Sequence, residues 1–261
     1  MKALTTYTVL LACVLVLSPC ARGQQTVRTL SAPYESDVMT ARPVRYWLGV
    51  ILGGNGYFHR GSYSPNCECA FSGESGARFS PGLAFIVEYP KLGLSVSFAA
   101  HYHDYSARFA YTETRNSIFI GNDPDSLVEY EKSSDVSLQY IRLVPSLFWY
   151  IPYTSVFFSA GLDLGFPLHA RYDNRERIVT PGVLYKDGGS EITLLPEQDV
   201  PGGKNIKVSF ALGVGGDLRL TTWLTLTPRL AASLPLSSVS SEDPSWKVLT
   251  VQGDLMIRVR L

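Results

Sequence analysis

Apolar and polar residues alternate with a period of two in eight successive segments from residue 45 onward. In the segment 135–150, for example, Leu143 and Leu147 share one parity while Arg142 has the other. Successive side chains of a β-strand point to opposite faces, so this period predicts strands with one apolar and one polar face. We therefore expect an all-β fold built from the segments 45–58, 79–89, 92–105, 135–150, 154–170, 206–218, 223–234 and 246–261.

The links between these segments differ in length in a regular way. Tight links lie at Pro90-Lys91, Pro152-Tyr153 and Thr221-Thr222. Long, polar links lie at 59–78, 106–134, 171–205 and 235–245. Short turns at one rim and long loops at the other are typical of bacterial outer-membrane barrels. We expect an eight-stranded antiparallel up-and-down transmembrane β-barrel with short periplasmic turns and long extracellular loops.

Charged residues within the segments fall on the parity opposite to the apolar residues. An Arg that faced lipid at mid-depth would cost about 2–4 kcal/mol, whereas inward-facing charges can pair with one another. An eight-stranded barrel is just wide enough to be filled by its own side chains, so paired charges would close it without a continuous aqueous channel. We therefore predict a charge network in the barrel lumen, formed by Glu88, Arg142, Asp163, Asp217, Arg219, Arg229, Asp254 and Arg258.

Aromatic residues collect near the ends of the segments. Their amphipathic rings prefer the level of the lipid head groups, so they predict two girdles. The rim with the short turns would carry Tyr46, Trp47, Tyr89, Trp149, Tyr150 and Trp223, and the opposite rim Tyr57, Tyr102, Tyr140, Phe166 and Trp246. Alternation alone does not identify the face that meets lipid, so a soluble barrel with an apolar interior remains an alternative.

Residues 1–23 have the pattern of a secretory signal peptide. Lys2 provides the positive charge, residues 8–17 form an apolar core that is too short for a transmembrane helix, and Ala21 and Gly23 are the small residues before the cleavage site. Lipidation of Cys20 is the alternative. We expect residues 24–44 to be a periplasmic lead-in and residues 45–261 to be the outer-membrane barrel.

Two cysteines, Cys67 and Cys69, lie in the first long link. Export implies an oxidising compartment, in which a disulfide between them is possible although strained by their close spacing. Two sulfurs alone do not complete a zinc site. The formal net charge of zero gives no indication of a nucleic-acid partner, and we expect no cofactor and no bound metal.

The pattern resembles the bacterial outer-membrane β-barrel family that includes the PorT-like proteins and is related in shape to the OmpA transmembrane domain. The resemblance rests on three stretches in order: Tyr140-Ile141-Arg142-Leu143-Val144-Pro145, Ser159-Ala160-Gly161-Leu162-Asp163-Leu164-Gly165, and Leu212-Gly213-Val214-Gly215-Gly216. The resemblance implies a location and a fold, with outer-membrane lipid and the outer-membrane assembly machinery as partners. It implies no catalytic residues. Such barrels usually end in an aromatic residue that the assembly machinery reads, whereas this chain ends in Leu261.

Two clusters are candidates for chemistry. His101 and His103 share one strand face and could begin a metal site or provide a general base. The acidic stretch 122–125 with Glu129 and Glu131 has oxygen ligands suited to calcium but lacks the spacing of an EF-hand. We expect a non-enzymatic surface protein whose loops form the recognition surface. The alternatives are a lipid-modifying acyl hydrolase or transferase that uses His101 or His103, and a soluble periplasmic ligand-binding barrel.

Overall fold

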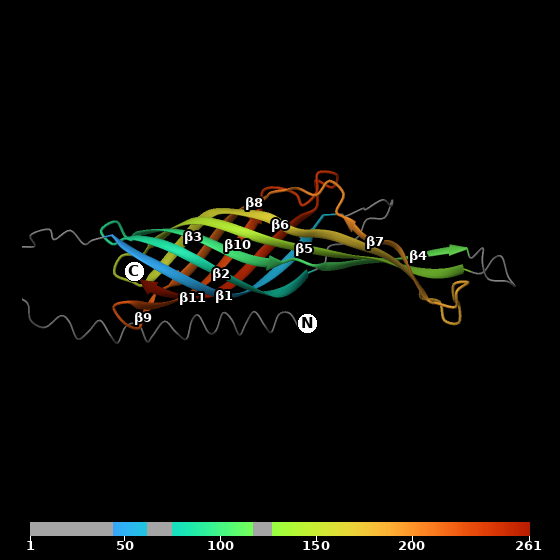
Figure 1. Ribbon diagram of the computed structural model, residues 1–261, viewed down its shortest axis with the longest axis horizontal. Helices are drawn as coiled ribbons and strands as arrows, with labels where there is room; N and C mark the ends of the chain where they lie inside the picture. The colour runs from blue at the N-terminus through green and yellow to red at the C-terminus, as the bar shows by residue number, and fades with distance from the viewer. Residues whose placement is uncertain (1–43, 62–74, 117–126) are drawn as a thin grey trace, which may run out of the picture. The chain divides into compact units, whose positions relative to one another are not determined.

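A computed structural model describes residues 44–61, 75–116 and 127–261 of the chain. These residues form one antiparallel sheet of eleven strands, shown in Figure 1. The strands are β1 (Arg45–Arg60), β2 (Ser75–Tyr89), β3 (Leu94–Asp104), β4 (Ala107–Asn116), β5 (Leu127–Tyr150), β6 (Val156–Ile178), β7 (Glu191–Asp199), β8 (Lys207–Gly216), β9 (Leu218–Arg219), β10 (Leu224–Pro235) and β11 (Lys247–Arg260). The predicted signal peptide, the cysteines Cys67 and Cys69 and the acidic stretch 122–125 lie outside the described residues.

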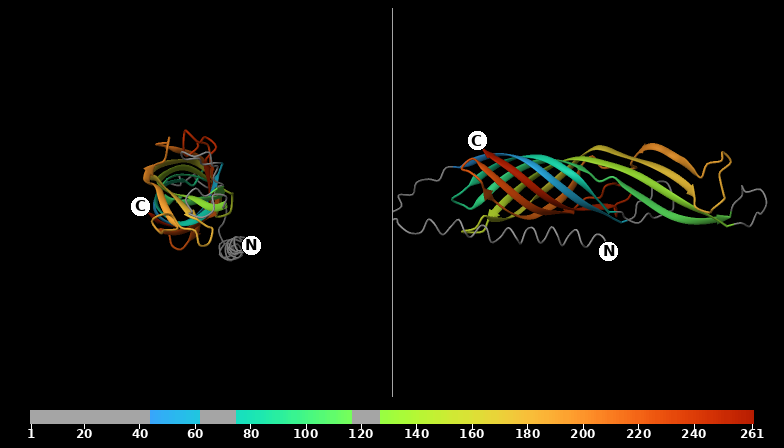
Figure 2. Two further views of the ribbon diagram at one scale, coloured as in Figure 1. Left: turned by 90° about the vertical axis from the view of Figure 1, so that its right-hand side faces the viewer. Right: turned by 90° about the horizontal axis from the view of Figure 1, so that it is seen from below.

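Eight of the strands close into a ring through their hydrogen-bonded pairings. Figure 2 shows the ring end-on and from the side. The order around the ring is β1-β2-β3-β5-β6-β8-β10-β11. The first and last strands close the ring by pairing along most of their length, from Trp47 opposite Arg260 to Arg60 opposite Lys247. The predicted all-β antiparallel arrangement is confirmed, and no helix occurs in the described ranges.

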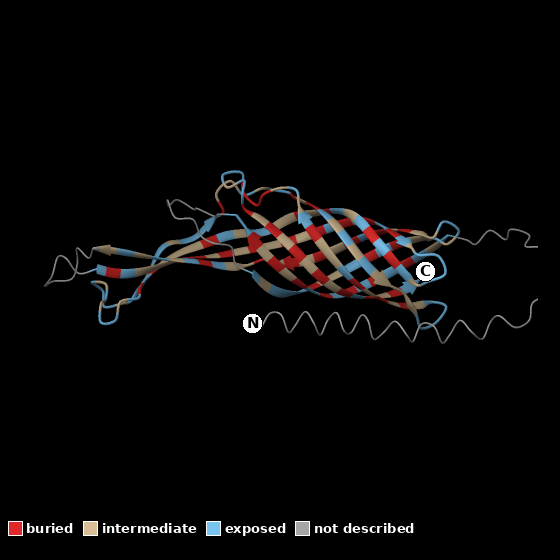
Figure 3. Ribbon diagram, turned by 180° about the vertical axis from the view of Figure 1, so that it is seen from behind, coloured by how far each residue is buried: buried red, intermediate tan, exposed pale blue. Residues whose placement is uncertain are grey.

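Buried and more exposed residues alternate along strands of the ring, as the coloured bands of Figure 3 show. In β1, Ile51 is fully buried, while its neighbours Val50 and Leu52 are 48% and 44% exposed. The exposed residues of the ring are large and apolar, whereas many of the buried ones are polar or charged. The ring therefore places its apolar row on the outside, the reverse of a soluble barrel. The outward row includes Leu48, Leu83, Phe98, Leu147, Phe158, Leu162, Leu212, Leu230 and Leu255.

The three predicted tight links are confirmed as turns. Leu92 donates its backbone N–H to the Tyr89 carbonyl at 3.0 Å, and Thr154 donates to Ile151 at 3.1 Å. In the second turn Tyr153 has a φ of 64°, a left-handed conformation that is uncommon for a residue other than glycine. In the third turn, which follows the short strand β9, Thr221 donates its backbone N–H to the Leu224 carbonyl at 3.1 Å. The predicted strand 206–218 is interrupted at Asp217, between β8 and β9.

Two of the links predicted as long loops contain strands, which corrects the sequence-based boundaries. β4 lies within 106–134, β5 begins at Leu127 rather than at residue 135, and β6 continues to Ile178 rather than ending at residue 170. Together with β7 they form a four-stranded extension of the sheet in the order β4-β5-β6-β7. The sequence suggested loops here because charged residues are frequent, but these charges pair across strands, as Arg177 does with Glu131.

Aromatic residues fill one end of the ring interior instead of forming a girdle there. Tyr57, Tyr140 and Trp246 were predicted to face lipid, but each is buried in an inner cluster with Tyr105 and Phe109. Their polar groups find partners inside: the Tyr57 hydroxyl donates to the Ser106 carbonyl at 2.5 Å. The cluster also includes Val200 and Val239 from the connections that follow β7 and β10, so it closes the ring at the end with the long connections.

Trp47 is a second correction to the predicted girdles. It faces inward and is buried in another apolar cluster, with Ile51, Ile86 and Met256. Its indole N–H donates to Glu88 Oε2 at 2.8 Å. By contrast, Tyr46, Tyr89, Trp149 and Trp223 are exposed near the short-turn end, as predicted for an aromatic rim. Among the described residues, no helix is long and apolar enough to cross a membrane.

Candidate functional site

The interior of the ring holds seven of the eight charged residues that the sequence singled out, while the eighth, Arg219 of β9, is 60% exposed. At its centre, Arg142 of β5 and Asp163 of β6 are both 3% exposed. Arg142 Nε lies 2.6 Å from Asp163 Oδ1, and its Nη2 contacts Asp163 Oδ2. The same guanidinium donates to the hydroxyls of Tyr105, at 3.0 Å, and Ser233, at 2.8 Å. This pair therefore connects the two sides of the interior.

A second pair lies between β10 and β11. Arg229 and Asp254 face each other in the register of the two strands, and Arg229 Nη2 lies 2.6 Å from Asp254 Oδ2. Gln252 donates from Nε2 to the other carboxylate oxygen at 2.7 Å. The same nitrogen lies 3.3 Å from His101 Nδ1, so a hydrogen-bonded chain runs from this ion pair to β3.

The remaining predicted charges cluster near the short turns. Arg258 pairs with Asp217, which also accepts hydrogen bonds from Tyr150, at 3.0 Å, and Thr227, at 2.9 Å. Arg219 lies 3.5 Å from Glu88. All eight predicted charges thus form ion pairs with one another. The sequence analysis missed Arg45, which lies 3.5 Å from Glu88 on the same inward parity of β1.

Lys207 was also missed by the sequence analysis. It opens β8 at the very edge of an alternating segment, it is 5% exposed, and its Nζ lies 4.4 Å from the centre of the Tyr105 ring. Among the described residues no carboxylate lies within 4.0 Å of this ammonium group. Lys207 has the same parity as Ser209, on the inward face of β8, and this parity could have identified it as an interior residue.

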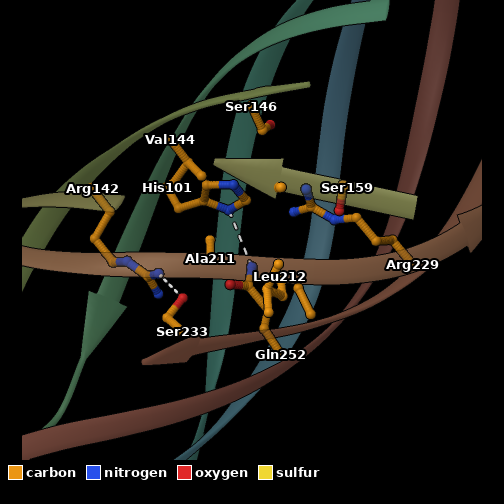
Figure 4. Close-up of a pocket in the computed structure, with 12 residues that line it drawn as sticks. His101, Arg142, Val144, Ser146, Ser159, Ala211, Leu212, Arg229, Ser233 and Gln252 are labelled. Carbon is orange, nitrogen blue, oxygen red and sulfur yellow. Dashed lines mark hydrogen bonds between the residues drawn. The ribbon is translucent and has the colours of Figure 1, made fainter. Parts of the chain in front are cut away.

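His101 and His103 face inward, as their parity predicts, but they are enclosed. His103 Nε2 lies 2.8 Å from Ser80 Oγ, and its Nδ1 lies 2.5 Å from Asn55 Nδ2. A hydroxyl beside an imidazole is the arrangement of an activated nucleophile. Here, however, the histidine is fully buried, and Arg142 occupies the remaining space at about 3.1 Å. The cavity beside His101 that Figure 4 shows has a volume of about 20 Å³, far too small for an acyl chain.

No group of three potential metal ligands occurs in the ranges that the structure describes. The two glutamates of the predicted calcium stretch belong to β5. Glu131 pairs with Arg177 and lies 3.8 Å from Arg108, so its carboxylate already has cationic partners. Glu129 belongs to no group of potential metal ligands among the described residues. Its backbone N–H donates to the Thr180 hydroxyl at 2.8 Å.

The four-stranded extension carries a second set of charges, most of them partly exposed. Arg175 lies within 3.8 Å of Asp135, Asp173 and Glu191, which come from three different strands. On the other face, Glu113 accepts hydrogen bonds from Arg115 Nε at 2.6 Å and from the Tyr111 hydroxyl at 2.9 Å. The Arg115 hydrogen bond and then that of Tyr111 lower the pKa of Glu113 to about 2.

The extension also has a small core of its own. Val128 and Ile178 are buried, and Arg115 lies over the Tyr130 ring at 5.2 Å. Glu176 is buried beside them and accepts hydrogen bonds from Arg115, at 3.2 Å, and from the Tyr185 hydroxyl, at 2.9 Å. Burial and the neighbouring Glu176 raise the pKa of Tyr185, which keeps its hydroxyl a donor. The extension is therefore an ordered surface.

Comparison with known proteins gives similarities of structure only. The sequence matches no protein-family model and no curated protein. Neisserial surface protein A is 12% identical, with 81% of this chain and 97% of that chain covered and a TM-score of 0.34. Ail, the attachment invasion locus protein of Yersinia pestis, is 11% identical, with 82% and 98% covered and a TM-score of 0.30.

The outer membrane protease OmpT of Escherichia coli is 8% identical, with 90% of this chain and 99% of that chain covered and a TM-score of 0.29. All three are outer-membrane β-barrel proteins. Similarities at these TM-scores carry no conclusion about the function of this chain.

Proposed function

We propose that this chain is a non-enzymatic integral outer-membrane β-barrel protein whose sheet extension presents a recognition surface. The observation that carries the proposal is the reversed burial of the ring. Its outward side chains are apolar and exposed, while its ion pairs are inside. In water such a surface would be a large exposed apolar patch, which soluble monomers rarely have. In a bilayer it is the surface that lipid requires.

The ring also satisfies the hydrogen-bonding groups of the backbone, as a structure that spans a lipid bilayer must. Each of its eight strands is hydrogen-bonded on both sides, so the ring has no free edge. An unpaired N–H or C=O group in the hydrocarbon core costs several kcal/mol, and closed barrels avoid that cost. Strands of 10 to 24 residues are long enough, since a tilted transmembrane strand needs about 9–11 residues.

The exposed aromatic residues support the same orientation. Trp149, Trp223, Tyr46 and Tyr89 ring the short-turn end of the apolar band, at the position expected for a head-group layer. The extension then projects from the opposite end. We infer that residues 1–23 direct export, that Cys67 and Cys69 face an oxidising compartment where they can pair, and that the assembly machinery inserts the barrel. The likeness to PorT-like and OmpA-like barrels is part of this proposal.

A non-enzymatic role is supported by the environment of the histidines. His101 and His103 are held by neighbouring side chains in a filled interior, so a lipid substrate has no path to them within the described structure. The extension is the alternative place for function, because recognition residues are usually carried on surface elements that a rigid scaffold positions. Its charges of both signs and its partly exposed Tyr111, Tyr130 and Tyr185 suit a polar partner.

The experiment that tests this proposal is fractionation of cells that express the full chain, followed by gel migration with and without boiling. We expect recovery in the outer-membrane fraction and a faster-migrating band before boiling, because a closed barrel resists detergent until it is heated. Recovery in the soluble periplasmic fraction would show that the apolar face does not meet lipid and would overturn the proposal.

A further inference from the structure

A small cavity that the proposed function does not use lies beside Arg142 and Arg229 (Figure 4). Its volume is about 20 Å³, which is space for about one particle the size of a water molecule. Seven inward-facing residues contribute polar side chains to its wall: His101, Arg142, Ser146, Ser159, Arg229, Ser233 and Gln252. Next to Ser146, Gly161 allows β5 and β6 to approach closely, because a Cβ at this glycine would meet the Pro145 carbonyl oxygen and lie 2.7 Å from the Ser146 Cβ.

The hydrogen bonds around the cavity determine where His101 carries its proton. Asp254 can only accept, so the Gln252 atom 2.7 Å from its Oδ1 is the amide nitrogen. That nitrogen donates its second proton to His101 Nδ1 at 3.3 Å. A neutral imidazole with an accepting Nδ1 carries its proton on Nε2. His101 Nε2 is thus a buried donor, and it has no hydrogen-bond partner in the described part of the chain.

Two further polar groups of the cavity are available to donate. Ser146 Oγ is buried without a hydrogen-bond partner in the described ranges. Arg229 uses Nε and Nη2 for Asp254, at 3.2 and 2.6 Å, and its third nitrogen, Nη1, makes no hydrogen bond to any described residue. The nearby carboxylates are occupied, Asp163 by Arg142 and Asp254 by Arg229. The cavity therefore has donors and needs an acceptor.

The charge of this layer of the interior points the same way. Two cationic side chains, Arg142 and Arg229, line the cavity, whereas the carboxylates of Asp163 and Asp254 do not. A small anion in the cavity would therefore contact positive charge in a poorly hydrated interior, where such an attraction is strong. Because the cavity admits only a small sphere, a carboxylate or phosphate ligand does not fit.

We propose that this cavity binds one monoatomic monovalent anion, a halide such as chloride, held by His101 Nε2, Ser146 Oγ and Arg229. The direct test is a crystal structure of the full mature protein grown in sodium bromide, with anomalous diffraction recorded at the bromine edge. We expect one anomalous peak inside the ring, within contact distance of these three groups. Density there without an anomalous signal would identify a water molecule and overturn the proposal.

A matched pair of variants tests the same site in solution. Ser146→Val fills the cavity, while Ser97→Val changes a buried, unpartnered hydroxyl of β3 that does not line it. We expect Tm to rise saturably when gluconate is replaced by bromide at constant ionic strength, in the wild type and in S97V but not in S146V. Equal Tm values of the wild type in the two salts would contradict the proposal, whatever the folding yield of either variant.

Discussion

Arg142 and Asp163, on the neighbouring strands β5 and β6, form a two-point ion pair in the middle of the ring, where both side chains are almost fully buried. Arg142 also donates to Ser233 on the opposite side of the interior. The pair thus holds together strands that are not neighbours in the sheet. A charge buried in this way is stable only while its partner is present.

Replacing Asp163 with Asn is expected to destabilise the protein by about 3–5 kcal/mol, because Arg142 would keep its buried charge without a counter-charge. Equilibrium unfolding in urea, with the protein refolded into lipid vesicles, measures this difference. Asp199→Asn is the control, since Asp199 pairs with Arg171 at 3.8 Å on the exposed extension and should give no measurable change. A loss below about 1 kcal/mol for Asp163→Asn would show that Arg142 has another counter-charge.

The interior packing predicts a closed ring rather than a pore. Aromatic residues close one end, and ion pairs fill the centre. We expect the protein in a planar lipid bilayer to show no stepwise ion conductance. The same preparation must show the heat-dependent gel shift, so that a silent recording is obtained from folded protein. Reproducible conductance steps would contradict the packing described for the interior.

The buried His103 is expected to affect stability and not lipid chemistry. His103→Ala leaves Ser80 and Asn55 without their partner, at a cost of about 1–3 kcal/mol. His169, which is exposed, provides the control, and His169→Ala should leave unfolding unchanged. Mass spectrometry of lipids from cells that express the wild type, either variant or none of them should give the same species. A lipid product that requires His103 would support the enzyme alternative instead.

The hydrogen bonds of Glu113 predict a pH dependence of the extension. Its pKa is lowered from 4.5 to about 2, so the stabilisation by Glu113 is fully present above about 4.5 and is lost as the pH falls toward 2. Hydrogen exchange of β4 amides, corrected for the intrinsic rate at each pH, should increase over this range. Glu113→Gln should remove the pH-dependent part and raise exchange at neutral pH. An unchanged profile in the variant would show that another carboxylate is responsible.

The parity of residues along the strands made the ring and its charges predictable. Arg142 and Asp163 each stand between two apolar residues, and Asp254 precedes Leu255, so a period of two assigns each of them to the face opposite the apolar row without knowledge of the strand order. The partners within the ion pairs could not be predicted. Arg142, for example, lies directly opposite Gly165 in the register of β5 and β6, and it pairs diagonally with Asp163, two residues away. The sequence alone contains the alternation but not this register.

The extension and the inner aromatic cluster were not predictable in the same way. In β4 and the outer part of β5, both faces carry charges, so the alternation of apolar and polar residues disappears although the strands remain. Tyr57 and Trp246 have the amphipathic character of girdle residues, but they find polar partners inside, such as His59 Nδ1 for the Trp246 indole at 3.0 Å. The residue type therefore predicted that Tyr57 and Trp246 lie near a rim of the barrel, but it did not predict whether their side chains face lipid or the interior.

The orientation of the strand faces can be tested directly with the four tryptophans. Trp149 and Trp223 point outward and are 67% and 54% exposed, whereas Trp47 and Trp246 point inward and are 3% and 1% exposed. Four variants that each keep one tryptophan, with the other three replaced by Phe, would be refolded into vesicles of lipids with brominated acyl chains. Bromine atoms quench tryptophan fluorescence on contact. We predict strong quenching of Trp149 and Trp223 and little quenching of Trp47 and Trp246. Equal quenching of all four, or quenching of the inner pair alone, would contradict a ring whose apolar face meets lipid.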